Sequence, residues 1–285
     1  MRRGRSWGRS SPRDRHRVAP VNASRDARRE RYGAWAVVTG ASGGIGLEIA
    51  REVAARGLNV VLAARNADKL DRLSSQLIQT HSVETRSAAV DLATPEGTRL
   101  LEQAVSGLDV GLFVGNAGFG TSGAFVNADM TNELAMIDLN VRHLAQQVHF
   151  FANLMRPRRA GGIILMSSIV SWQGVPRAAN YAATKAYVQS LAEGLHRELQ
   201  AEGIDVLTSA PAQVATGFME RADMRGDGAD AGLVARKTLD ALGRRATVYP
   251  HFKSWFLSSA LSTLPRPIRV RILEGVMQDM TRHHD

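Results

Sequence analysis

The chain has 285 residues and 44% of them are hydrophobic, so it can bury a sizeable core as one large domain or two small ones. It has no cysteine, which excludes disulfides, thiolate catalysis and Cys-ligated zinc, and no uninterrupted apolar run of the about 18 residues that a transmembrane helix needs. The net charge of +9 is concentrated in residues 1–31, which contain eleven arginines and three acidic residues, so the remainder is close to neutral.

Residues 1–33 are polar, rich in arginine and without apolar periodicity. We expect a disordered tail there, or a start codon placed too far upstream. The alternatives are a basic arm for nucleic acid or anionic lipid, and an arginine-rich organellar presequence. The segment lacks the apolar centre of a secretory signal, so a cytoplasmic location is expected. Because the rest of the chain is nearly neutral, no nucleic-acid partner is expected.

From Ala34 onward, short apolar runs alternate with amphipathic segments. The expected strands span residues 34–39, 59–64, 85–90, 110–114, 162–166 and 204–208. The expected helices span residues 44–56, 67–80, 95–106, 129–156 and 179–201. This alternation predicts the α/β class, with a Rossmann-type doubly wound parallel sheet in a three-layer α/β/α arrangement. No change of composition divides residues 34–250, so we expect a single domain there.

The turn between the first strand and the first helix after it reads Thr39-Gly-Ala-Ser-Gly-Gly-Ile-Gly46. Gly40 permits a tight turn, Gly44 lets the backbone approach a pyrophosphate, and Gly46 lets helix and strand pack closely. The N–H groups at the helix N-terminus attract an anion. A strand before the turn and a helix after it favour dinucleotide binding over an ordinary turn. The candidate cofactor contacts here are Thr39, Gly40, Ser42, Gly44, Ile45 and Gly46.

The second strand is followed by Ala64-Arg65-Asn66. NAD-binding folds often place an acid here, which bonds the adenosine ribose and repels a 2′-phosphate. Arg65 instead offers a planar fork that can pair with that phosphate, and no acid is adjacent. NADP(H) is therefore favoured over NAD(H), the alternative being an ordinary solvated arginine.

A second constellation is Tyr181-Ala-Ala-Thr-Lys185, preceded by Ser168 at the end of a predicted strand. Tyr181 and Lys185 share one helix face because they are four residues apart. A free tyrosine has a pKa of about 10, too high for efficient acid–base catalysis at neutral pH, and we expect the nearby ammonium to lower it. Ser168 can donate a hydrogen bond to a substrate oxygen that gains charge. These residues, in this order after the glycine-rich turn, predict carbonyl–alcohol chemistry.

With these motifs, the region from about residue 34 to 220 closely resembles the short-chain dehydrogenases/reductases of the shorter, single-domain type. The resemblance implies that Tyr181 is the catalytic acid/base, that Ser168 polarises the carbonyl, and that Lys185 holds the nicotinamide ribose. It also implies that Asn140 is the fourth catalytic residue, which positions a water in a proton relay. Without the resemblance, an asparagine in a helical stretch is more often a local distortion or a core hydrogen bond.

Further cofactor positions follow from the same resemblance. They are Asp91 and Leu92 at the adenine, Asn116, Ala117 and Gly118 at the adenosine, and Pro211, Val214 and Thr216 near the nicotinamide and pyrophosphate. Ala212 stands where the family usually has glycine, which would cost about 1 kcal/mol if the position needed positive φ. Together with Ser168 and Tyr181, the candidate substrate contacts are Gln213 and Phe218.

Residues 217–230 are expected to form a mobile lid over the substrate, with Phe218, Met219 and Met224 either lining an apolar pocket or folding onto the body. Residues 251–285 form an amphipathic C-terminal extension. For this extension, subunit contact or capping of a hydrophobic channel is favoured, and a membrane surface is the alternative. His251, His283 and His284 make no credible metal site.

The leading hypothesis is an NADP(H)-dependent carbonyl reductase or alcohol dehydrogenase that uses a Ser-Tyr-Lys mechanism on a small or lipid-like hydrophobic substrate. The alternative is a non-catalytic dinucleotide-binding protein with a regulatory or assembly role. The set of Ser168, Tyr181 and Lys185 argues for the enzyme, because a pure binder needs none of them. The resemblance further implies a homodimer or homotetramer.

Overall fold

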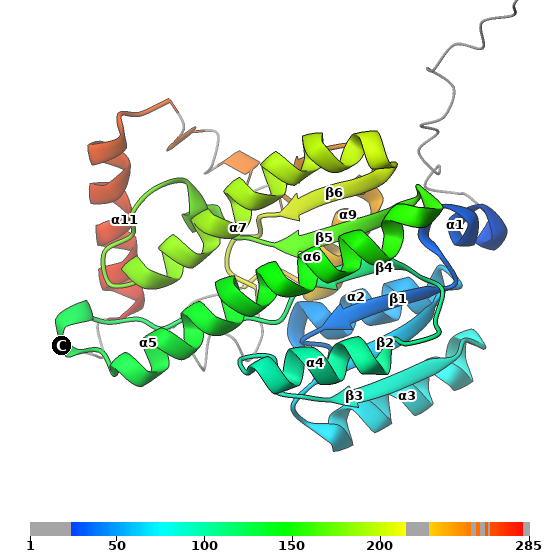
Figure 1. Cartoon of the computed structure of the whole chain (residues 1–285). Helices are drawn as coiled ribbons and strands as arrows, with labels where there is room; N and C mark the ends of the chain where they lie inside the picture. The colour runs from blue at the N-terminus through cyan, green and yellow to red at the C-terminus, as the bar shows by residue number, and fades with distance from the viewer. Residues whose placement is uncertain (1–23, 215–227, 252–254, 257–259, 262, 282–285) are drawn as a thin grey trace, which may run out of the picture.

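The computed structural model describes residues 24–214, 228–251, 255–256, 260–261 and 263–281, which form a parallel sheet with helices on both faces (Figure 1). In this part of the chain the sheet has seven strands in the order β3-β2-β1-β4-β5-β6-β7. The strands are β1 (Trp35–Thr39), β2 (Asn59–Ala64), β3 (Thr85–Ala89), β4 (Val110–Gly115), β5 (Gly161–Met166), β6 (Ile204–Ser209) and β7 (Thr247–Val248). The Rossmann-type sheet predicted from the sequence is confirmed.

Two hydrophobic cores sandwich the sheet, because its central strands are apolar on both faces. One core lies under α2 (Gly44–Ala55), α3 (Ala67–His81) and α9 (Ala231–Ala241). The other lies under α4 (Pro95–Ala104), α6 (His143–Met155) and α7 (Ala179–Glu198). Each helix turns an apolar stripe inward, as Leu70, Leu73 and Leu77 do on α3. The three-layer arrangement is therefore confirmed as well.

The helix expected over residues 129–156 is interrupted. It consists of α5 (Met130–Ile137), a π-helical turn η3 (Asp138–Arg142) and α6. A π turn holds one residue more than an α turn, and here that extra residue accompanies the inward side chain of Asn140, which is 1% exposed. Short 3-10 turns complete the described fold: η2 (Phe125–Asn127), η4 (Arg156–Arg158), η5 (Ile169–Trp172) and η6 (Leu199–Glu202).

The order of the strands reverses between β1 and β4. From β1 the chain continues to β2 and β3 on one side of the sheet, then returns to β4 and continues to β7 on the other side. Open α/β sheets bind ligands in the crevice that such a reversal leaves at the carboxyl ends of the strands. The glycine-rich turn follows β1 and Asn116 follows β4, so both flank this crevice.

The expectation of a disordered tail over residues 1–33 is wrong for its last part. Residues Arg25–Tyr32 form α1, whose N-cap is Ser24, and α1 lies at the end of the molecule from which the strands start (Figure 1). Arg31 forms an ion pair with Asp205 of β6, with 2.7 Å between Nη2 and Oδ1, and the Tyr32 hydroxyl donates to the same carboxylate at 3.0 Å. Because α1 has few apolar residues, contacts with a residue far away in the sequence stabilise it. A local sequence pattern does not reveal such contacts.

The amphipathic extension contains α11 (Arg266–Met280), which lies at the opposite end of the molecule from α1 (Figure 1). Its buried residues Leu273 and Met277 pack against Val175, Ala178 and Ala182, in the segment that leads into α7 and the first turn of that helix. Within the described residues, no helix is long and apolar enough to cross a membrane.

Candidate active site

The glycine-rich turn has a backbone that only glycine adopts easily. Gly40 and Gly44 have φ values of 68° and 56°, in the left-handed region that strains other residues. At Gly46 the constraint is space, because an added Cβ would lie 2.2 Å from the carbonyl oxygen of Gly40. The structure therefore explains why glycine stands at each position. The Gly40 turn and the close helix packing at Gly46 agree with the sequence prediction.

The N-terminus of α2 differs from those of α3, α4 and α9. The helices α3, α4 and α9 are capped by the side chains of Asn66, Thr94 and Asp230. At α2 the N-cap is Gly43, which offers no side-chain bond, and nothing lies within 4 Å of where its Cβ would be. The first turn of α2 therefore has no side-chain cap, and the helix dipole at this end favours an anion such as a phosphate.

Hydrogen bonds join the ends of β1 and β4 below this turn. The Thr39 hydroxyl donates to the Val114 carbonyl at 3.2 Å and accepts from the N–H groups of Asn116 and Ala117 at 2.9 and 3.0 Å. The Asn116 amide donates to the Thr39 carbonyl at 3.0 Å. Thr39 and Asn116 therefore use their polar side chains to fix the floor of the crevice.

Asn140 is bonded within the protein on every side. Its amide nitrogen donates to the Phe119 carbonyl at 2.8 Å and to the Thr184 hydroxyl at 3.1 Å, while its oxygen accepts from the Phe119 N–H at 3.2 Å. Both alternatives weighed from the sequence, a helix distortion and a core hydrogen bond, describe this side chain. An added Cβ on Gly118 would lie 2.9 Å from the Asn140 oxygen and 3.5 Å from Lys185 Nζ, so Gly118 lies against both groups.

Ser168, Tyr181 and Lys185 come together at the carboxyl end of β5. Ser168 follows the strand, and the other two occupy the first turns of α7. The Ser168 side chain lies near enough to the Tyr181 phenol to favour its ionised form. The Lys185 ammonium donates to the Met166 carbonyl at 2.8 Å and lies 5.8 Å from the centroid of the Tyr181 ring. All three side chains are buried.

Burial dominates the proton affinities of this cluster. It raises the pKa of Tyr181 to about 12, although the nearby Ser168 hydroxyl acts in the opposite direction. Burial also lowers the pKa of Lys185 to about 8. The expectation that Lys185 brings the tyrosine pKa below its usual value is wrong for this structure, because the loss of phenolate hydration is the largest effect.

An apolar wall next to Tyr181 was not predicted from the sequence. Phe119 and Met136 are buried against the tyrosine, and Val170 packs against the same cluster. Met136 precedes the π turn and Phe119 follows the Asn116-Ala-Gly118 motif, so their approach to Tyr181 depends on the fold. The only available signal was the position of Phe119 directly after a recognised motif.

Arg177 was also missed. It has a φ of 63°, which is unusual for a residue other than glycine. Its carbonyl accepts from the Gly123 N–H at 2.9 Å, and its guanidinium donates to the Thr281 carbonyl at 3.4 Å. Arg177 thus connects the start of α7 to the loop after β4 and to the end of α11. The sequence contains no signal for such a contact.

The remaining predicted cofactor residues follow the carboxyl ends of β1, β2 and β3. Arg65 is exposed after β2, and Asp91 is exposed after β3 with its carboxylate accepting from the Ala93 N–H at 3.1 Å. Leu92 is buried in the core beneath α4 and α6, so its side chain serves packing. Ser42 and Ile45 are half-buried in the glycine-rich turn.

The loop after β6 is described as far as Val214. The Pro211 carbonyl accepts from the Ile169 N–H, next to Ser168, and Val214 is buried and bridges to Ala229. Ala212 does not have positive φ, so it carries none of the strain considered for this position. Gln213 contacts α11 through Met280, with 3.1 Å between Nε2 and Sδ. Thr216, Phe218 and residues 217–227 of the predicted lid lie outside the described residues.

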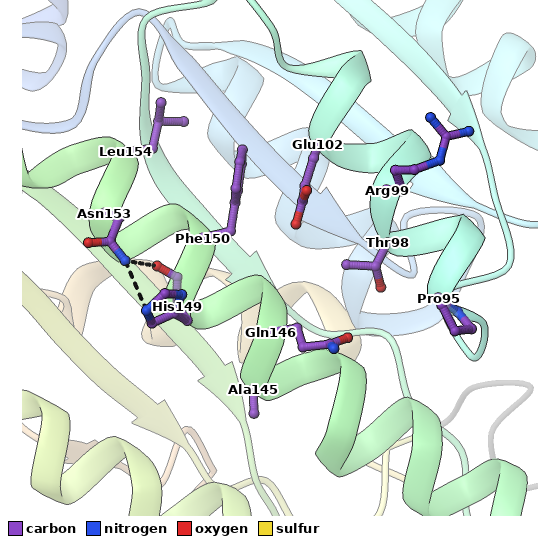
Figure 2. A pocket seen from close by; sticks show the side chains of 10 residues that line it. All are labelled: Pro95, Thr98, Arg99, Glu102, Ala145, Gln146, His149, Phe150, Asn153 and Leu154. Atoms are coloured by element: carbon purple, nitrogen blue, oxygen red, sulfur yellow. Dashed lines mark hydrogen bonds between the residues drawn. The ribbon is translucent and has the colours of Figure 1, made fainter.

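A groove of about 760 Å³ lies between α4 and α6 (Figure 2). Its lining includes Thr98, Arg99 and Glu102 of α4 and Phe150 of α6. Also in the lining, the Asn153 amide donates to the carbonyl of His149 at 2.9 Å. None of the lining residues is a candidate catalytic or cofactor residue. The groove opens on the outside of the helical layer, whereas the proposed chemistry lies at the strand ends.

Comparisons with known proteins agree with this geometry. The sequence model of the family described as short chain dehydrogenase matches residues 34–225. The very-long-chain 3-oxoacyl-CoA reductase of Homo sapiens is 30% identical over 256 residues, which are 88% of this chain and 82% of that protein. A short-chain dehydrogenase from Sphingobium yanoikuyae in complex with NADPH has a TM-score of 0.74 at 28% identity, over 80% of this chain and 92% of that one. A 7β-hydroxysteroid dehydrogenase has a TM-score of 0.80 over 86% and 98%, and at 23% identity this likeness concerns the fold.

Proposed function

The chain belongs to the short-chain dehydrogenase family, and we propose that within it the protein is an NADPH-dependent reductase of carbonyl groups on lipid-like substrates. Its family makes it an oxidoreductase that interconverts C=O and CH–OH with a nicotinamide cofactor. The observation that carries the proposal is the buried cluster at the end of β5, where Ser168, the Tyr181 phenol and Lys185 lie together.

The crevice fits a dinucleotide. The helix α2 presents a start without a side-chain cap beside the left-handed glycines Gly40 and Gly44, and Gly118 lies directly against Asn140 and Lys185. In our proposal the N–H groups of α2 hold the pyrophosphate, Asp91 and Asn116 border the adenosine, and Lys185 holds the nicotinamide ribose. When bound, the reduced nicotinamide supplies a hydride to the substrate carbon.

Each residue of the cluster has one task in the proposed reduction. The Tyr181 hydroxyl supplies the proton that the carbonyl oxygen needs once its carbon has received the hydride. The Ser168 hydroxyl donates a hydrogen bond to the same oxygen and so stabilises its developing negative charge. With a pKa raised to about 12, Tyr181 keeps its proton at neutral pH, which suits an acid in the direction of reduction. Asn140, through its bonds to Phe119 and Thr184, fixes the π turn next to Lys185.

Two observations support NADPH over NADH. Arg65 is exposed directly after β2, at the position where an acid would favour NAD, and Asn66 beside it caps α3. Among the similar solved structures, the dehydrogenase from Sphingobium yanoikuyae and the L-sorbose reductase from Gluconobacter frateurii are both complexes with NADPH.

The substrate class rests on the apolar wall and on the relatives. Phe119, Met136 and Val170 surround Tyr181 with apolar atoms, and the Met280 side chain of α11 reaches Gln213. The curated relatives are named very-long-chain 3-oxoacyl-CoA reductases. We therefore propose a 3-oxoacyl thioester or a comparable ketone on a long apolar chain.

The test follows NADPH absorbance with 3-oxoacyl-CoA substrates of increasing chain length and with small ketones. We expect kcat/KM to rise with chain length, and Tyr181→Phe to bind NADPH with unchanged affinity but to lose at least about 100-fold in turnover. Tyr187→Phe on the exposed side of α7 is the matched control and should keep full activity. Full activity of Tyr181→Phe would exclude the mechanism. NADPH binding without any turnover would favour the non-catalytic alternative.

A further inference from the structure

The helix α11 has two apolar faces, and the described residues pack against only one of them. The inner face, with Leu273 and Met277, packs against the start of α7. The outer face carries Ile268, Ile272 and Val276, which are 47%, 40% and 45% exposed. Because these residues are four apart, they form one stripe along the helix. A soluble helix normally turns polar residues outward, so this stripe is unusual.

A second stripe runs along α5, where Met130 and Leu134 are four residues apart and exposed. Phe125 and Val126 are also exposed, on η2, which two extended residues separate from α5. In the described part of the chain, nine of the thirteen exposed large hydrophobic residues lie on η2–α5 or between residues 255 and 276. The other four are Ile78, Leu100, Leu154 and Tyr187. Exposed apolar side chains are therefore concentrated rather than scattered, which marks an interaction surface.

The two stripes belong to one end of the molecule. Arg177 joins them, since its carbonyl accepts from Gly123 just before η2 and its guanidinium donates to Thr281 at the end of α11. Figure 1 shows α5 and α11 at the end toward which the strands point. This is also the end at which Ser168 and Tyr181 lie. We call the surface made by Ile268, Ile272, Val276, Val126, Met130 and Leu134 the apolar end face.

Cationic side chains border the α11 stripe. Arg266, Arg269 and Arg271 occupy the first two turns, and none of them has an ion-pair partner among the described residues. The Arg269 Nε donates to the Leu264 carbonyl at 2.8 Å. The acidic residues of the helix, Glu274 and Asp279, come later. An apolar stripe beside arginines that lack acidic partners is the pattern of a helix that lies in the surface of a bilayer, with its apolar side chains among the acyl chains and its arginines at anionic headgroups.

We propose that the apolar end face docks the protein onto a lipid bilayer that contains anionic headgroups. The positive charge of the α11 arginines favours an anionic bilayer as the partner. Anionic headgroups would supply the negative charges that these arginines lack among the described residues. Docking there places the active-site end of the fold toward the lipid. The proposal does not depend on the proposed function, since the binding can be measured without cofactor or substrate.

The first experiment is flotation of the full chain with vesicles of phosphatidylcholine alone, or of phosphatidylcholine with phosphatidylglycerol. We expect the wild type to bind the anionic vesicles, and Ile272→Asp with Val276→Asp to lose at least about tenfold in partition. Arg271→Gln should lose about fivefold on anionic vesicles only. The matched control is Ile78→Asp on α3, a residue 47% exposed on another surface, which should bind like the wild type. All variants carry the same arginine-rich N-terminal segment, so its attraction to anionic lipid cancels.

A second measurement uses the absence of cysteine from the chain. A single cysteine at Ile272→Cys or Ile78→Cys can be labelled with an environment-sensitive fluorophore. We expect vesicles to shift the emission to the blue at position 272 and to leave position 78 unchanged. Equal binding by wild type and the double variant, or equal shifts at both positions, overturns the proposal. So does a smaller molar mass of the double variant with unchanged vesicle binding, because the face would then be a contact with a second copy.

Discussion

Arg31 and Asp205 are 174 positions apart in the sequence, yet their side chains form an ion pair of 2.7 Å that fastens α1 to β6. Both side chains are mostly buried, at 14% and 18% exposure, and Tyr32 donates to the same carboxylate. The arginine-rich N-terminal region therefore has two parts. Residues 25–32 form α1 and belong to the fold, and residues 1–23 lie outside the described residues.

We predict that deletion of residues 1–23 leaves the free energy of unfolding unchanged, whereas deletion of residues 1–33 lowers it. The longer deletion removes Arg31 and Tyr32 and leaves the Asp205 carboxylate without these partners, which costs at least about 2 kcal/mol. Urea denaturation of the two truncated proteins checks this. Arg31→Ala should reproduce most of the loss, and equal stability of both truncations would contradict the prediction.

The glycine-rich turn gives a matched pair of substitutions. Gly46→Ala places a Cβ 2.2 Å from the Gly40 carbonyl, so the start of α2 must shift. We expect a loss of about 1–3 kcal/mol in stability and weaker NADPH binding. Gly43→Ala adds a Cβ in open space at an extended backbone, where φ is −179°, and should keep the stability. Differential scanning fluorimetry with and without NADPH distinguishes the two, and equal melting temperatures would refute the steric argument.

Arg65 determines the cofactor preference in our proposal. Arg65→Ser should raise the KM for NADPH about tenfold or more and leave the KM for NADH unchanged, because only NADPH has the 2′-phosphate that the guanidinium would bind. The control is Arg72→Ser, an exposed arginine on α3. Steady-state kinetics with both cofactors provides the measurement. A wild type with equal kcat/KM for NADH and NADPH would contradict the proposed preference for NADPH.

The buried Lys185 makes stability depend on pH. Burial lowers its pKa from 10.5 in the unfolded chain to about 8 in the fold, so between these values the unfolded state binds a proton that the fold does not. Above pH 10.5 the amine is neutral in both states, so its burial costs no stability. As the pH falls from 10.5 to about 8, the free energy of unfolding decreases. Between pH 10 and about 12, Tyr181 acts in the opposite direction because its pKa is raised.

We therefore predict that Lys185→Met removes the rise in stability between pH 8 and 10.5, and that the variant is more stable than the wild type below pH 8. Urea midpoints measured across this range check the prediction. Surface lysines titrate alike in both proteins and cancel in the difference. A wild type and variant with parallel pH profiles would show that Lys185 is not desolvated.

The sequence predicts most of the fold because its signals are local. The strand over 59–64 is predicted to the residue, and the helix over 67–80 ends one residue later, since apolar runs and amphipathic segments can be recognised in short windows. Tyr181 and Lys185 share a helix face through their spacing alone. The cofactor and catalytic roles of these residues, the homo-oligomer and the cytoplasmic location stay predictions.

Other features depend on contacts between distant residues. The helix α1 is held by Asp205, the π turn by the bonds of Asn140 to Phe119 and Thr184, and the position of α11 by Val175. The direction of the Tyr181 pKa was mispredicted for a related reason. The spacing shows that a lysine is near, but it does not show how deeply the phenol is buried.

The π turn at Asp138–Arg142 separates the number of residues in its helix from the direction in which the helix faces. Because the turn holds one residue more than a regular one, removing a single residue there would restore an ordinary helix. The apolar residues of α6 would keep facing the sheet, whereas Asn140 would lose the local widening that accompanies its inward side chain. A one-residue deletion at this turn should therefore preserve the fold and break the bonds of Asn140 to Phe119 and Thr184.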